Sequence, residues 1–212
     1  MQLTKYAHAT VTLENDSKTL LLDPGVFAGN AADLLATADA VLITHDHADH
    51  FDKEPIVRAL DARPELVVYG PETIVEALDR GDQVVAVHAG DQLIVAGFDV
   101  AAFGEKHATI HADIPVTDNV GYLVNGKVFH PGDAYLVPGV EVETLLVPTS
   151  GPWAKLSEAV DYVREVKPAR LVQIHEALLS EIGQQSTATM LGEQGLTGIP
   201  MTLLAEGESL AV

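Results

Sequence analysis

The chain has no cysteine among its 212 residues. This absence excludes disulfide bonds and thiolate ligands, so any transition metal has to be bound by histidine and carboxylate side chains. Aromatic residues make up only 5% of the sequence, whereas hydrophobic residues make up 47%. We therefore expect a core built mainly of valine, leucine, isoleucine and alanine.

Basic residues are also scarce: 12 lysines and arginines stand against 31 acidic residues, for a formal net charge of -19. Binding to a nucleic-acid backbone requires clustered lysine and arginine, and no run of three basic residues occurs. We therefore expect neither nucleic acid nor a membrane as partner, but a small-molecule substrate. The oligomeric state is left open, a homo-oligomer included.

Long apolar runs are missing as well. No stretch approaches the roughly 18 apolar residues of a membrane-spanning helix, and the N-terminal residues lack the basic and apolar regions of a secretory signal. No linker or repeat divides the sequence. We expect a cytoplasmic protein with a single domain over residues 1–212.

Short apolar stretches bounded by turn residues predict more strands than helices. Helices are predicted over 55–60, 72–78 and 156–166. Strands are predicted over 6–13, 19–22, 40–44, 66–69, 83–87, 92–96, 98–103, 119–124, 127–130, 145–147, 171–174, 201–204 and 209–212. Asn125-Gly126 is a strong hairpin-turn signal. This order favours an α/β or α+β fold, in which two mixed sheets pack face to face with helices outside.

A histidine-rich segment follows the predicted strand 40–44. It reads His45-Asp46-His47-Ala48-Asp49-His50, and imidazole with carboxylate suits zinc, iron or manganese. A tight loop points successive side chains in different directions, so the first two histidines can bind one metal while Asp49 and His50 face a second. The alternative is a polar loop whose aspartates cap the next helix, which explains an aspartate but not three histidines.

Residues 44–50 match the T-H-x-H-x-D-H motif of the metallo-β-lactamase superfamily, and the chain resembles this family over nearly its whole length. Further family landmarks occur in the family's order: Asp23, His107 or His111, Gly132-Asp133, and His175. The resemblance implies a four-layer αβ/βα sandwich of two mixed sheets flanked by helices. It also implies two divalent metal ions at one edge of the sheets, with zinc expected and manganese or iron as alternatives.

The resemblance also implies a role for each ligand. His45, His47 and His107 are expected to bind the first metal. Asp49, His50 and His175 are expected to bind the second, with Asp133 between the two. Asp49 is in addition the candidate catalytic residue, which orients the nucleophile and passes a proton.

Some of these positions have other interpretations. Asp133 is also a plausible turn residue, and His175 an ordinary histidine at a strand end. His107 is preferred over His111 because it lies nearer the end of the strand 98–103, which leaves His111 to support a ligand or to face the substrate.

Five more residues are placed near the site or on the surface. Asp23 is expected beside the histidine-rich loop as a hydrogen-bond partner for a ligand. His8 and His130 are expected near the site, and His88 on the surface. Trp153 either walls a substrate pocket or anchors the helix 156–166.

Residues 6–10 (YAHAT) and 148–153 (PTSGPW) resemble the short lactonase-like branch of the family. The predicted function is a metal-dependent hydrolase that directs a metal-activated water at a small ester, lactone or phosphoester. The alternatives are a phosphodiesterase acting on a small nucleotide and a non-catalytic module that binds a metal or metabolite. A redox di-iron site ranks last, because no flavin-binding domain is evident.

Overall fold

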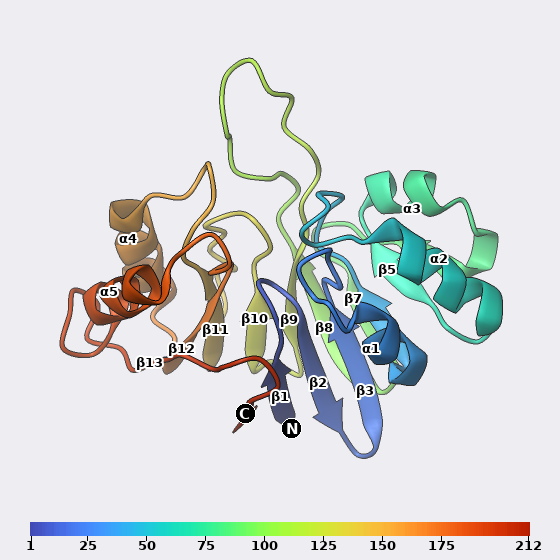
Figure 1. The fold of residues 1–212 in the computed structure, drawn as a ribbon, viewed down its shortest axis with the longest axis horizontal. Helices are drawn as coiled ribbons and strands as arrows, with labels where there is room; N and C mark the ends of the chain where they lie inside the picture. The colour runs from blue at the N-terminus through green and yellow to red at the C-terminus, as the bar shows by residue number, and fades with distance from the viewer.

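The computed structural model describes residues 1–212, whose strands form two seven-stranded mixed sheets (Figure 1). The first sheet has the order β14-β1-β2-β3-β4-β5-β6. Its strands are β1 (Gln2–Lys5), β2 (Val11–Asn15), β3 (Lys18–Leu22), β4 (Ala40–Leu42), β5 (Val68–Gly70), β6 (Val84–Ala86) and β14 (Ser209–Ala211).

The second sheet has the order β13-β12-β11-β10-β9-β8-β7. Its strands are β7 (Gln92–Val95), β8 (Phe98–Phe103), β9 (Gly121–Val124), β10 (Val128–His130), β11 (Thr144–Pro148), β12 (Arg170–Ile174) and β13 (Met201–Thr202). The predicted hairpin turn is confirmed, because β9 and β10 pair antiparallel and both Asn125 and Gly126 have positive φ.

Each sheet changes from antiparallel to parallel pairing across its width. The first sheet is antiparallel from β14 to β3 and parallel from β3 to β6. The second is antiparallel from β7 to β10 and parallel from β10 to β13. Parallel neighbours have their carboxyl ends at the same sheet edge, so the loops that follow these strands gather there.

Five α-helices cover the outer faces of the two sheets. α1 (Ala31–Thr37), α2 (Lys53–Ala62) and α3 (Glu72–Leu78) lie on the first sheet, and α4 (Leu156–Val166) and α5 (Glu181–Leu191) lie on the second (Figure 1). A short 3-10 helix, η1, spans Gly81–Gln83. The layers therefore run helix, sheet, sheet, helix, and the predicted αβ/βα sandwich is confirmed.

Side-chain alternation explains why both faces of each sheet are buried. In β3, Leu20 and Leu22 belong to the core between the sheets, whereas Leu21 packs among the residues beneath α1, α2 and α3. In β12, Val172 points into the core between the sheets and Leu171 toward the α4 side. Successive strand residues face opposite sides, so a strand covered on both faces is continuously apolar.

Three predicted helices are confirmed, but α1 and α5 were missed. α1 has only seven residues, AADLLAT, which is too short for a clear helical period. α5 contains Gly183 and buries only Leu191, so its sequence carries little of the apolar stripe that identifies a surface helix.

The predicted strand 6–13 is wrong at its start. β1 ends at Lys5 and β2 begins at Val11. Between them the chain makes a turn, in which the N–H of Tyr6 donates to the carbonyl of Thr10 and His8 has a φ of 61°.

None of the five α-helices has the length and apolar character that a membrane-spanning segment requires.

The loop after β3 packs tightly against the histidine-rich segment, and this contact depends on a glycine. A Cβ on Gly25 would lie 1.8 Å from the carbonyl oxygen of Asp49, whereas a Cβ on nearby Gly29 would have nothing within 4 Å. Gly25→Ala is therefore expected to lower the free energy of unfolding by about 1–3 kcal/mol, as overpacking does.

Gly29→Ala is the matched control and is expected to stay within about 0.5 kcal/mol of the wild type. Urea unfolding of both variants measures the difference. Equal stabilities would contradict the close approach at Gly25.

Candidate metal centre

The histidine-rich segment forms the loop between β4 and α2. The N–H groups of His50 and Phe51 both donate to the carbonyl of His47, at 3.0 and 2.9 Å, and close a tight turn. The loop after β3 supports it, because the N–H of Val26 donates to Ala48 and that of Asp52 to Pro24. The turn thus presents its ligand side chains from a backbone fixed on both sides.

Eight residues form three overlapping groups with metal-binding potential. Within each group, the candidate ligand atoms lie within 4.8 Å of one another. The groups are His45 with His47 and His107; His8 with Asp49, His50 and His175; and His45 with His50 and Asp133. The structure therefore gathers every predicted ligand into one centre, and it adds His8.

Asp133 lies between the two sides of this centre. Its Oδ1 is 3.0 Å from Nε2 of His50, and its Oδ2 is 3.0 Å from Nε2 of His175 and 3.4 Å from Nε2 of His107. The N–H of Asp133 donates to the side-chain oxygen of Asn119 at 2.9 Å. The carboxylate can therefore contact ions on both sides.

Five buried imidazole nitrogens have no hydrogen-bond partner: Nε2 of His45, His50 and His107, and both ring nitrogens of His175. Buried polar atoms in proteins normally have a partner, and each exception calls for an explanation. Nε2 atoms that point at one another and at carboxylates fit a divalent ion, which imidazole and carboxylate bind when thiolates are absent. The donor set therefore fits the metals that the family resemblance implies.

The other ring nitrogen of several of these histidines is held by a neighbour. Nδ1 of His50 donates to Oδ2 of Asp23 at 2.7 Å, Nδ1 of His45 to Oγ1 of Thr44 at 3.0 Å, and Nδ1 of His107 to the carbonyl of Ala108 at 2.5 Å. Such partners fix the tautomer and leave Nε2 free for a metal.

Asp23 is fully buried and forms hydrogen bonds with both His50 and Thr44. Its carboxylate also accepts from the N–H and the Oγ1 of Thr44, both at 2.7 Å. The structure thus places Asp23 where it was expected, beside a predicted ligand. The role of Thr44 was missed, although it is the first residue of the motif.

Charges in the centre shift the pKa values of its members. Burial lowers the pKa of His45, and the neighbouring His50 lowers it further. Burial also acts to lower the pKa of His50, but the carboxylates of Asp133 and Asp23 outweigh it and hold that pKa well above its usual value. Burial acts to raise the pKa of Asp133, but His50, His107 and His175 hold it well below the usual range.

Asp49 stays ionised for a similar reason. Burial acts to raise its pKa, but the nearby imidazoles of His175 and His8 outweigh burial and lower it. Its side chain is 27% exposed, so this carboxylate is both charged and open to solvent.

The other histidines singled out in the sequence differ in how far they are buried and in whether they belong to the centre. His107 belongs to the centre, whereas the His111 side chain is 65% exposed and accepts from the N–H of Asp113. His130 is buried, with Nε2 donating to the carbonyl of Ala9. His88 is exposed beside Glu72.

Trp153 is buried, and its Nε1 donates to Oδ2 of Asp133 at 2.8 Å. Neither of its two predicted roles included this bond. Tryptophan can only donate through Nε1, so the bond orients the carboxylate that lies between the two metal groups.

The chain matches the family model described as the β-lactamase superfamily domain over residues 2–175. The chain belongs to this family of metallo-β-lactamase-fold metallo-hydrolases. The matched range ends at His175, so all the predicted ligands of this family member lie within it. The predicted family is thereby confirmed, whereas the ligand assignments, the number and identity of the metals and the substrate stay predictions.

Relatives and solved structures resemble this metallo-hydrolase along most of its length. Protein Rv0786c of Mycobacterium tuberculosis is 42% identical over 186 residues, which are 85% of this chain and 86% of the relative. The UPF0173 metal-dependent hydrolase EAT1b_0495 of Exiguobacterium sp. is 26% identical, and the match covers 96% of this chain and 99% of the relative. The fold is similar to that of Igni18, a metallo hydrolase from Ignicoccus hospitalis, with a TM-score of 0.73 and 19% sequence identity. The superposition covers 99% of this chain and 97% of Igni18.

Elemental analysis of untagged protein tests the two-metal assignment. We expect close to two metals per chain in the wild type and a lower content in His47→Ala and His175→Ala, which each lose an imidazole from a different side of the centre. The exposed His88→Ala is the control and should match the wild type. Wild-type protein that takes up no metal on reconstitution would contradict the assignment.

Metal binding should also depend on pH. The raised pKa of His50 favours a protonated ring when no ion is bound, and a metal ligand has to be neutral. Each ion bound there therefore displaces a proton, and the apparent affinity should weaken as the pH falls. Calorimetric titrations in two buffers of different ionisation enthalpy count the protons released; zero release would contradict the prediction.

Proposed function

We propose that this protein is a hydrolase that cleaves a small ester, lactone or phosphoester. We propose further that it binds two divalent metal ions, which we expect to be zinc. The observation that carries the proposal is the position of Asp133, within 3.4 Å of imidazoles from both metal groups. A carboxylate so placed suits two neighbouring ions that share one ligand.

The geometry supports the ligand roles that the family resemblance implies. His45, His47 and His107 would hold the first ion, and Asp49, His50 and His175 the second, with Asp133 between them. A pair of bound divalent ions lowers the pKa of a coordinated water to about 7 and polarises the oxygen of the substrate.

The chain's own residues would prepare the reaction in three ways. Asp133 is oriented by Trp153 Nε1 and by the N–H hydrogen bond to Asn119. Asp23 and Thr44 fix the rings of His50 and His45. Asp49, ionised and partly exposed, would orient the attacking water and pass its proton on, which requires it to lie within hydrogen-bond reach of that proton.

The relatives support a hydrolase, since one is named a metal-dependent hydrolase and a protein of similar fold is named a metallo hydrolase. The acidic composition supports a small substrate without an extended phosphate backbone. The candidate bond types share one requirement, which is an electrophilic carbon or phosphorus centre presented to the activated water.

Turnover of metal-loaded protein on parallel panels of lactones, carboxylic esters and chromogenic phosphodiesters tests the proposal. We expect turnover on at least one panel, and its loss on treatment with a chelator. A metal-loaded protein that binds metabolites but hydrolyses no member of any panel would instead favour a non-catalytic role.

Asp133→Asn keeps the size of the side chain and removes its charge. We expect metal-dependent turnover to fall by at least about 100-fold, because loss of a ligand should cost more than loss of a ligand's hydrogen-bond partner. The circular dichroism spectrum should stay that of the wild type. Unchanged turnover in Asp133→Asn, with His88→Ala as reference, would contradict the role of Asp133.

A further inference from the structure

His8 lies in the turn between β1 and β2, where its backbone is unusual. Its φ of 61° is in the left-handed region, which is uncommon outside glycine, although histidine adopts it more often than most residues do. Its side chain is nevertheless fully buried. Backbone strain of this kind persists where the surroundings impose it, and it gathers at functional sites.

The backbone of His8 is tied to the end of β12. Its carbonyl accepts from the N–H of His175 at 3.1 Å, and its N–H donates to Oε1 of Glu176 at 3.2 Å. The same Oε1 accepts from Nζ of Lys5 at 2.6 Å, and the Lys5 side chain is only 3% exposed. Three contacts thus join the turn of the first sheet to the metal-binding end of the second.

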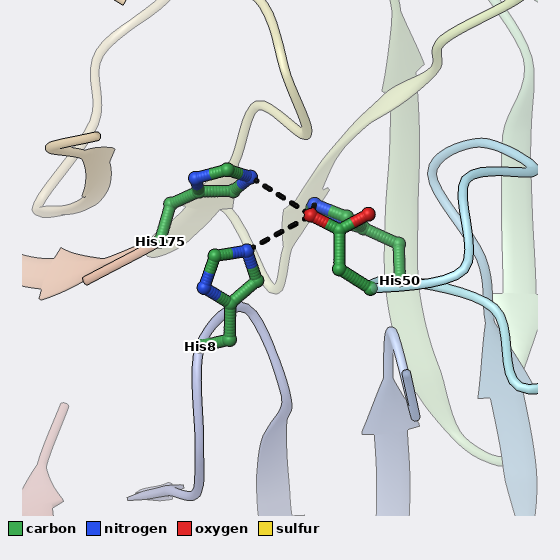
Figure 2. Close-up of side chains that lie close together, drawn as sticks. His8, His50 and His175 are labelled. Atoms are coloured by element: carbon green, nitrogen blue, oxygen red, sulfur yellow. Dashed lines mark hydrogen bonds and ion pairs between the residues drawn. The ribbon is translucent and has the colours of Figure 1, made fainter. Parts of the chain in front are cut away.

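The ring of His8 points into the centre, toward His50 and His175 (Figure 2). Its Nε2 is 3.0 Å from Oδ2 of Asp49, and its Nδ1 is 3.4 Å from the N–H of Ala177. A backbone N–H can only donate, so Nδ1 is the acceptor and carries no proton. The neutral ring therefore has its proton on Nε2, which donates to Asp49.

This arrangement separates His8 from the predicted ligands. Nε2 of His45, His50, His107 and His175 has no hydrogen-bond partner, whereas both ring nitrogens of His8 have one. The ring of His8 also packs against that of His175, with centroids 3.8 Å apart. His8 therefore lies next to the metal ligands, but its Nε2 donates a hydrogen bond and offers no free lone pair to a metal.

We propose that His8 is a positioning residue for the second metal: its Nε2–H holds Oδ2 of Asp49, and its ring holds His175. The inference rests on the proposed metal centre. It assigns to the β1–β2 turn the task of aligning two ligands that come from different sheets.

Two substitutions at the same strained position separate this role from a structural one. His8→Gln keeps an N–H donor near the position of Nε2, whereas His8→Ala removes it. Both are ordinary side chains at a positive φ, so the backbone cost is matched. If the alanine variant does not fold, His8→Asn replaces it, since asparagine tolerates this conformation but its amide is too short to reach Asp49.

The readouts are zinc affinity, by competition with a chromophoric chelator, and the absorption spectrum of the cobalt-loaded protein. We expect His8→Ala to bind the second ion about 10–100-fold more weakly, as loss of a ligand's hydrogen-bond partner does, and to bind the first ion normally. His8→Gln should recover most of the affinity and the wild-type cobalt spectrum.

Two results would overturn the inference. Wild-type affinity for both ions in His8→Ala would show that Asp49 does not need this donor. Equal weakening in His8→Gln and His8→Ala would show that the N–H donor to Asp49 is not what positions the second ion. Failure of the wild type to bind any metal would instead refute the proposed function.

Discussion

A buried carboxylate among buried imidazoles is the constraint on which the rest of this structure depends. Asp133 has almost no exposure and lies within 3.4 Å of three histidines. An ionised carboxylate is costly to bury unless positive charge compensates it. The raised pKa of His50 favours a protonated ring that supplies this charge when no ion is bound, and bound ions would supply it in the proposed metal-loaded protein. The surrounding segments are arranged to keep this charge balance in place.

The supporting hydrogen bonds show how the fold meets that constraint. Asp23, at the end of β3, fixes both Thr44 and His50, and Trp153, from the loop before α4, fixes Asp133. These residues come from loops that follow parallel strands, whose carboxyl ends meet at one sheet edge. The change from antiparallel to parallel pairing in each sheet therefore decides where a polar centre can be built in an otherwise apolar sandwich.

The sequence was sufficient to predict the features that are local. His45, His47, Asp49 and His50 stand within six residues, so their chemistry is evident before folding, and the αβ/βα sandwich followed from strand and helix order together with the family resemblance. The contacts of Thr44 with Asp23 and of Trp153 with Asp133 were not predictable, since each joins segments that only the tertiary structure brings together. His8 was placed in a strand because nothing in the sequence of residues 6–10 marks the turn in which its backbone becomes left-handed.

The proposed ligands lie far apart along the chain, from position 45 in a loop of the first sheet to position 175 at the end of a strand of the second. A shared ion would therefore act as a cross-link that closes a very long loop. The entropic cost of closing a loop in the unfolded chain rises with the length of the loop. In an unfolded chain only the histidine-rich segment could offer several ligands at once. We therefore expect metal uptake to follow assembly of the sandwich, and bound ions would then stabilise the contact between its two sheets.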